Sequence, residues 1–143
     1  MKVVWESRKI LDLPTLAISV TAVRVPVRVG HAAAVNVTLA RPLSPDEARA
    51  LWAGSPGLTV VDDPQAGVYP TPLMASGRDD VLVGRARRDL SQPDGLEFFI
   101  ASDNLRKGAA TNAIQIAQRL FPTQGGIPPA GAILPGVRAT EAP

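Results

Sequence analysis

The chain has 143 residues, a length that favours one domain or one domain with a tail. Its 15 Lys and Arg residues exceed its 13 Asp and Glu residues only slightly, so the charge surplus is too small to predict nucleic-acid binding. The absence of cysteine excludes disulfides, cysteine-bound metals and a cysteine nucleophile from these residues. The single histidine, His31, excludes a metal site built from several histidines of one chain, and we expect no bound metal.

The first third of the chain predicts a helix followed by extended segments. Residues 2–11 mix apolar and charged side chains at helical spacing, without a capping residue at the start, and Pro14 ends the helix. Residues 16–29 alternate apolar and polar side chains but change parity near Ala22, which predicts two consecutive strands or one strand with a bulge. Residues 35–39 alternate again and predict a half-buried strand.

The middle of the chain carries the clearest local signal. Ser44, Pro45 and Glu47 form a capping box with proline at the first helical position, and Gly54 supplies the stop. Ala48, Leu51 and Trp52 are its expected apolar stripe. A short strand at 58–61, a proline-containing loop at 62–76 and a pair of strands at 81–87 and 96–101 are expected to follow.

The last part of the chain predicts a second helix at 108–120, since its apolar residues recur at i, i+4, i+7, i+8 and i+11. Repeated glycines and prolines from 122 to 143 break any periodicity, so we expect a disordered tail there. The order of helix, strands, helix, strands and helix predicts an α+β fold on a mostly antiparallel sheet.

Several classes of protein are disfavoured. The sequence holds no apolar run of the roughly 20 residues that a membrane helix needs, so we expect no membrane partner. Charged residues follow Met1 where a secretion signal would be apolar, and a cytoplasmic protein is the expectation. None of the short motifs typical of P-loop, dinucleotide-binding, serine-hydrolase or zinc-protease sites occurs.

One small group of residues could carry chemistry. Arg24 and Arg28 lie four apart on an extended run and point to one face, and His31 follows a glycine. Arginine grips carboxylates with two hydrogen bonds, and histidine moves protons near neutral pH, so this group suits an acidic small-molecule substrate. The alternative is a solvated arginine face with a structural histidine, which the spacing alone favours.

Two further groups have the same two interpretations. Glu6 and Lys9 are neighbours on one helix face and could bind a ligand or simply form a surface ion pair. The polar segment 103–108, which leads into the last helix, could offer free N–H groups to an anion or be an ordinary capped helix start.

Taken together, several segments resemble aspartate-semialdehyde dehydrogenase, from about Lys2 to Leu120 and in the family's order. The stretch 103–115 and the spacing from Arg24 to His31 are the most specific parts. The matching segments are Glu6–Leu11, Val23–Val27 with Gly30 and His31, Tyr69–Pro72, Val83–Arg87 and Ser102–Ala117. The resemblance covers the family's C-terminal substrate and dimerisation domain and its returning helix.

The resemblance implies both a fold and a reaction. The fold is that of a glyceraldehyde-3-phosphate-dehydrogenase-like C-terminal domain, with helices on one face of a mixed sheet. Residues 1–101 would form the substrate and dimerisation domain, and residues 102–121 would form the helix that packs on a nucleotide-binding domain. The reaction is the NADPH-dependent reductive dephosphorylation of β-aspartyl phosphate to aspartate semialdehyde, through a cysteine thioester, in lysine, threonine and methionine biosynthesis. A homodimer or a tetramer is implied.

The resemblance also implies a role for each matching side chain. The arginine at position 24 grips the substrate carboxylate, and His31 is the general acid and base. Glu6 is associated with the substrate amino group, Lys9 helps to hold phosphate, and Asn112 lies near the nicotinamide of NADP.

The sequence also departs from the family. The glycine-rich dinucleotide loop and the catalytic cysteine are not among these residues, and Ala32-Ala33 replace a pair that is often Ser or Ala followed by Glu. We therefore expect the chain alone to be inactive and NADP to be bound mainly by an N-terminal half. Two alternatives are one chain of a split enzyme and a non-catalytic dimerising remnant.

Overall fold

The computed structural model describes residues 1–121, and the predicted tail at 122–143 lies outside them. The elements follow the predicted order of helix, strands, helix, strands and helix, except that one strand stands where more than one was expected after the first helix and a short unpredicted helix lies in the loop at 62–76. The helices are α1 (Lys2–Ile10), α2 (Pro45–Ala53), α3 (Pro72–Ala75) and α4 (Thr111–Leu120), with a π-helical turn η1 (Arg106–Ala110) before α4. The strands are β1 (His31–Thr38), β2 (Leu58–Val60), β3 (Val81–Arg88) and β4 (Gly95–Ser102).

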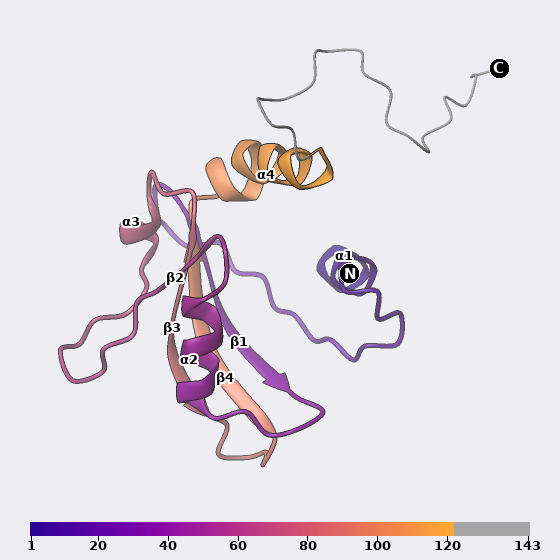
Figure 1. The fold of residues 1–143 in the computed structure, drawn as a ribbon, viewed down its shortest axis with the longest axis vertical. Coiled ribbons are helices and arrows are strands. Elements are labelled where there is room, and N and C mark those ends of the chain that lie inside the picture. Colours follow the sequence, from indigo (N-terminus) through magenta and orange to yellow (C-terminus); the bar gives the residue numbers. More distant parts are fainter. Residues whose placement is uncertain (122–143) are drawn as a thin grey trace.

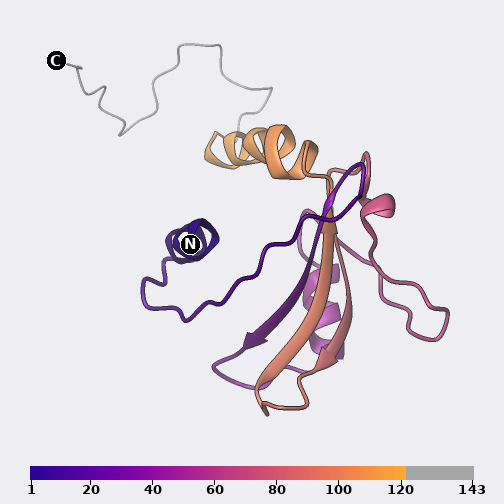
Figure 2. The same ribbon diagram turned by 180° about the vertical axis from the view of Figure 1, so that it is seen from behind.

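The four strands form one sheet in the order β1-β4-β3-β2. β4 pairs antiparallel with both β1 and β3, while the short β2 pairs parallel with β3. Helix α2 lies against one face of this sheet. Helix α4 lies past one end of the strands and α1 lies to the side of the sheet, as the two opposite views show (Figures 1 and 2). The α+β fold and the mostly antiparallel sheet predicted from the sequence are confirmed.

The capping box at the start of α2 is confirmed. The backbone N–H of Glu47 donates to Ser44 Oγ at 3.2 Å, and the N–H of Ser44 donates to a carboxylate oxygen of Glu47 at 2.8 Å. The Ser44 hydroxyl also donates to that carboxylate at 2.6 Å, and this bond, followed by the one from the Ser44 N–H, lowers the pKa of the Glu47 carboxyl below its ordinary value. Two N–H groups that would otherwise lack partners at the start of the helix are thereby satisfied.

Replacing Ser44 by Ala is expected to destabilise the fold by about 1 kcal/mol, because the side-chain acceptor for the N–H of Glu47, the third residue of the helix, is lost. Urea unfolding measures the effect. Ser55→Ala is the matched control, since Ser55 only donates from its hydroxyl to the Leu51 carbonyl near the other end of the helix. Equal midpoints for the Ser44 variant and the native chain would contradict a stabilising cap.

The best-buried apolar side chains lie where α3 meets the central strands. Ala75, Leu82 and Ala101 are fully buried, and Val61 packs against them. On α2, Ala48 is fully buried and the Trp52 ring lies 5.1 Å from the Phe98 ring on β4. Leu51, predicted to belong to the same stripe, is 61% exposed, so the buried face of α2 is narrower than its sequence pattern suggested.

A bulge interrupts the pairing of β3 with β4 between Gly84 and Arg87. Arg85 adopts a left-handed conformation there, with φ +54°. The buried Asp62 carboxylate holds this conformation, since it accepts the N–H groups of Arg85 and Ala86 at 2.8 and 3.0 Å and the Arg49 guanidinium at 2.7 Å. Three bonds to one carboxylate thus set the local path of the strand.

At the bulge, β3 meets the segment that contains Tyr69 and Pro70. The Arg85 guanidinium lies 5.5 Å from the centre of the Tyr69 ring, within the range of a cation–π contact. Pro70 is fully buried, and its ring lies beside the backbone of Gly84. The segments Tyr69–Pro72 and Val83–Arg87 therefore pack on each other.

Three details of the predicted elements were wrong. Residues 16–29 are extended but form no strand within the described part of the chain, and Val23 and Val25 are 75% and 55% exposed. Alternation alone does not make a strand, because each strand needs a hydrogen-bonding partner. β1 begins at His31, four residues earlier than predicted, because the end of β4 supplies a partner there. The expected loop at 62–76 contains the short helix α3.

No helix within residues 1–121 is both long and apolar enough to cross a membrane.

Candidate active site

Two segments that lie far apart in the sequence meet at one end of the sheet. The backbone N–H of Gly30 donates to the side-chain oxygen of Asn104 at 2.9 Å, across 74 residues. Directly after this bond, His31 opens β1 opposite Ser102, the last residue of β4. The strand that begins with the histidine is thus joined to the turn that leads into η1 and α4.

Asp103 organises that turn. Its side chain is buried and accepts the N–H of Gly77 at 2.9 Å and those of Leu105 and Arg106 at 2.9 and 3.3 Å. These bonds, led by the one from Gly77, lower the pKa of the Asp103 carboxyl. The carboxylate is therefore a structural anchor between the loop after α3 and the turn after β4.

The N–H groups of residues 105–108 all have partners within the turn. The side chain of Asp103 accepts the first two, and its backbone carbonyl accepts those of Lys107 and Gly108 at 2.9 and 3.3 Å. These four N–H groups are therefore not free to bind an anion, and Asp103 caps the start of the helical segment.

A second acidic side chain connects the start of the helical segment η1–α4 to the loop that precedes β3. Asp79 accepts the Arg106 guanidinium and the Thr111 hydroxyl, each at 2.8 Å. The bond from Arg106, followed by that from Thr111, lowers the pKa of the Asp79 carboxyl. Arg106 is the first residue of η1 and Thr111 is the first residue of α4. The Asp79 carboxylate therefore fixes the direction in which the segment η1–α4 leaves the sheet.

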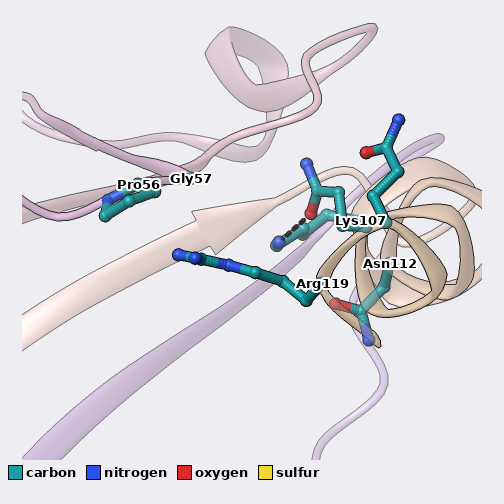
Figure 3. A pocket seen from close by; sticks show the side chains of 7 residues that line it. Pro56, Gly57, Lys107, Asn112 and Arg119 are labelled. Atoms are coloured by element: carbon teal, nitrogen blue, oxygen red, sulfur yellow. Dashed lines mark hydrogen bonds between the residues drawn. The ribbon is translucent and has the colours of Figure 1, made fainter. Parts of the chain in front are cut away.

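An open pocket of about 460 Å³ lies between the turn before β2 and the helical segment η1–α4 (Figure 3). Lys107 donates to the Gln115 amide oxygen, and the Arg119 side chain extends toward Pro56. The lining residues are Pro56, Gly57, Lys107, Asn112, Gln115, Gln118 and Arg119. Two cations among neutral amides suit a ligand that carries phosphate and carboxamide groups.

The predicted site residues occupy four different places. Asn112 lines the pocket, and His31 lies at the exposed start of β1, next to the Gly30–Asn104 bond. Arg24 is exposed on the extended segment 16–29. Glu6 and Lys9 are exposed on α1. No hydrogen bond or ion pair within residues 1–121 joins any two of these five side chains.

The ion pair considered for Glu6 has a different partner. Glu6 lies 3.6 Å from the Lys2 ammonium, at i,i+4 spacing, and both side chains are largely exposed. Such a pair contributes little to stability, so it leaves the Glu6 carboxylate available to another cation.

Other residues of the site were missed at the level of sequence. Asn104 was part of a matching segment but had no role assigned, and Lys107 and Arg119 were not considered as ligand contacts. A signal for the pocket was present, because Asn112, Gln115 and Arg119 recur at i, i+3 and i+7 on α4. The Gly30–Asn104 bond had no such signal, since it joins two loops.

Helix α4 exposes much of its predicted apolar stripe. Ile116 and Leu120 are 53% and 64% exposed, and α4 buries none of its residues in the described part of the chain. We expect its amide hydrogens to exchange roughly 100-fold faster than those of β3 and β4 in the monomeric chain, because few apolar contacts oppose local opening. Hydrogen exchange read by NMR tests this, and protection equal to that of the strands would contradict it.

Comparison with known proteins identifies a family and several relatives to which this chain is similar. The family described as semialdehyde dehydrogenase, dimerisation domain, matches residues 1–107. An aspartate-semialdehyde dehydrogenase of Legionella pneumophila is 54% identical over 121 residues, which are 84% of this chain and 35% of that protein. One from Aquifex aeolicus is 45% identical over 119 residues, 83% of this chain and 35% of that protein.

Solved structures agree with the sequence comparisons. Aspartate semialdehyde dehydrogenase II from Vibrio cholerae, in a crystal structure described as complexed with ASA, superimposes with a TM-score of 0.79 at 41% identity. The match covers 84% of this chain and 35% of that one. The chain thus spans about a third of the length of the relatives it matches.

Proposed function

Because the chain belongs to the semialdehyde dehydrogenase family through its dimerisation domain, we propose that it forms the substrate-binding part of an aspartate-semialdehyde dehydrogenase. The enzyme would convert β-aspartyl phosphate, with NADPH, to aspartate semialdehyde and phosphate. The 54% identity to a relative bearing that name, extending over most of residues 1–121, is the observation that carries this proposal.

The proposal divides the described chain at the end of β4. Residues 1–101 form the substrate and dimerisation domain, and residues 102–121 form a helix that packs on a nucleotide-binding domain. Exposure of Ile116 and Leu120 supports this division, because a stripe of that kind is normally covered in a folded protein. Burial of such side chains contributes about 1.5–3 kcal/mol each. The same family membership supports assembly as a homodimer or a tetramer.

The roles proposed for the substrate-binding residues are those that the family resemblance implies, and the charges of the side chains agree with them. Arg24 holds the substrate carboxylate through two parallel hydrogen bonds, and Glu6 accepts from the substrate ammonium. Lys9 neutralises the phosphate that leaves. His31 takes the proton from the attacking thiol and later supplies a proton in the hydride-transfer step. The thiol belongs to polypeptide other than these residues, since the sequence contains no cysteine.

The pocket beside α4 fits part of the nucleotide cofactor. Asn112 has an amide that can donate to and accept from a carboxamide such as that of nicotinamide, and Lys107 and Arg119 can neutralise phosphate. NADPH, when bound, supplies the hydride of the reaction. This chain would contribute only one side of the cofactor site.

A chimera tests the proposed function. Residues 1–121 replace the matching third of the Legionella pneumophila relative, whose remaining part supplies the rest of the polypeptide. Oxidation of NADPH in the presence of β-aspartyl phosphate is followed, with the unsubstituted relative as the control. Activity within roughly tenfold of that control is expected if the residues take the proposed roles. A folded, dimeric chimera without activity would contradict the proposal and favour a non-catalytic dimerising remnant.

The split-enzyme alternative is separated by a mixing experiment. The 143-residue chain is combined with a separate polypeptide that carries the nucleotide-binding half of the same relative. Activity that arises only on mixing would show that covalent continuity is not required. Activity in the chimera but not in the mixture would favour a single continuous enzyme.

A further inference from the structure

The turn before His31 is tightly confined. Gly30 has φ +94°, a conformation that side chains rarely adopt. A side chain added there would approach Pro72 Cβ and the Ser102 carbonyl oxygen, each at 3.2 Å. The backbone of Gly30 therefore lies between α3 and the end of β4, and its N–H points to Asn104 Oδ1. The close neighbours and the hydrogen bond together hold the Gly30 backbone in one position.

The acceptor for that N–H is itself held firmly. Asn104 follows the buried Asp103, whose side chain binds the N–H groups of Leu105 and Arg106. Asn104 is also half-buried, and only Leu105 separates it from η1. Its amide oxygen therefore moves with the helical segment that carries Asn112, and the bond to Gly30 transmits the position of that segment to β1.

The histidine depends on this backbone for its position. Within residues 1–121 the exposed His31 side chain makes no hydrogen bond or ion pair, so the contacts that fix the position of this residue are those of its backbone. That path is set on one side by the pairing of His31 with Ser102 and on the other by the bond between Gly30 and Asn104.

We propose that Asn104 is a positioning residue for His31, which it holds in register with the helix that carries Asn112 through the N–H of Gly30. This inference rests on the proposed function for the role of the histidine. It gives a role to Asn104, which is not among the residues proposed to bind the substrate or the cofactor or to transfer protons. A general acid and base and a cofactor contact on separate elements must keep a fixed separation, and here one amide connects those elements.

Three variants of the chimera test the proposal by kinetics. Asn104→Leu keeps the volume but removes the acceptor, and it is expected to lower kcat roughly tenfold to a hundredfold with KM for the substrate nearly unchanged. Asn104→Asp keeps an oxygen acceptor and is expected to restore most of kcat. Asn36→Ala is the matched control, because it removes an amide bound to Asp89 and Glu97 farther along β1 and should leave kcat unchanged.

NMR of the 143-residue chain tests the same point without activity. The sequence has one histidine, so its ring gives a single set of signals that belongs to His31. In Asn104→Leu the Gly30 amide should lose protection from exchange and the ring signals should shift, whereas Asn36→Ala should leave both unchanged.

Each result bears on one of the two proposals. Unchanged ring signals and an unchanged kcat in Asn104→Leu would overturn the positioning role. A fall in kcat that Asn104→Asp does not restore would also overturn it, in favour of a general structural role. An inactive native chimera would contradict the proposed function instead, and the NMR result would then still decide whether Asn104 positions His31.

Discussion

Replacing Arg24 by Lys in the chimera is expected to raise the KM for β-aspartyl phosphate by tenfold to a hundredfold. A guanidinium can bind both oxygens of a carboxylate in one plane, whereas an ammonium offers a single point charge. The lost charged hydrogen bond contributes roughly 1.5–3 kcal/mol, which corresponds to that range in affinity. Initial rates at varied substrate concentration measure the change, and kcat should fall less than kcat/KM.

Arg28→Lys is the control for this experiment. Arg28 lies four residues further along the same exposed, extended segment. It is not one of the residues to which the family resemblance gives a role in substrate binding. It removes the same chemical group from the same kind of surface, so its KM should stay within about twofold of the native value. An unchanged KM in Arg24→Lys would remove Arg24 from the site and favour the solvated arginine face.

Replacing Gly84 by Ala is expected to cost about 4–5 kcal/mol of folding free energy, which places it among the most damaging single substitutions for this domain. A Cβ at this position would lie 2.0 Å from the Val61 carbonyl oxygen and 2.8 Å from Pro70 Cδ. The backbone of Val61 cannot withdraw without breaking its bond to Val83, whose carbonyl accepts its N–H at 2.8 Å. The added methyl group must therefore separate β3 from the segment beside it.

Thermal and urea unfolding measure this effect, and Gly54→Ala is the matched control. Gly54 has an ordinary φ of −88°, and an added Cβ would have its nearest neighbours at 3.8 Å. That substitution should change stability by less than about 1 kcal/mol. A Gly84→Ala chain as stable as the control would show that the packing of Val61 and Pro70 on β3 is looser than the structure indicates.

Much of the local structure was predictable because it depends on neighbours in the sequence. The capping box of Ser44 and Glu47 satisfies N–H groups within three residues, so its letters alone indicate where α2 begins. The strands β3 and β4 were predicted, at 81–87 and 96–101, because alternation and a short polar turn occur together, and the structure extends them to Val81–Arg88 and Gly95–Ser102. The same sequence reading failed for 16–29, where the alternation is present but no strand within residues 1–121 pairs with it.

The amino-acid sequence by itself determined most of the order of the elements, the α+β class, the absence of a thiol and the family resemblance that implies roles for Arg24, His31 and Asn112. Only the tertiary structure decided that Gly30 meets Asn104, that Asp62 holds a left-handed Arg85 and that Lys107 and Arg119 share a pocket with Asn112. Periodicity and capping are local properties of a chain. Contacts between loops far apart in sequence depend on how the whole sheet is assembled, and no short-range pattern encodes them.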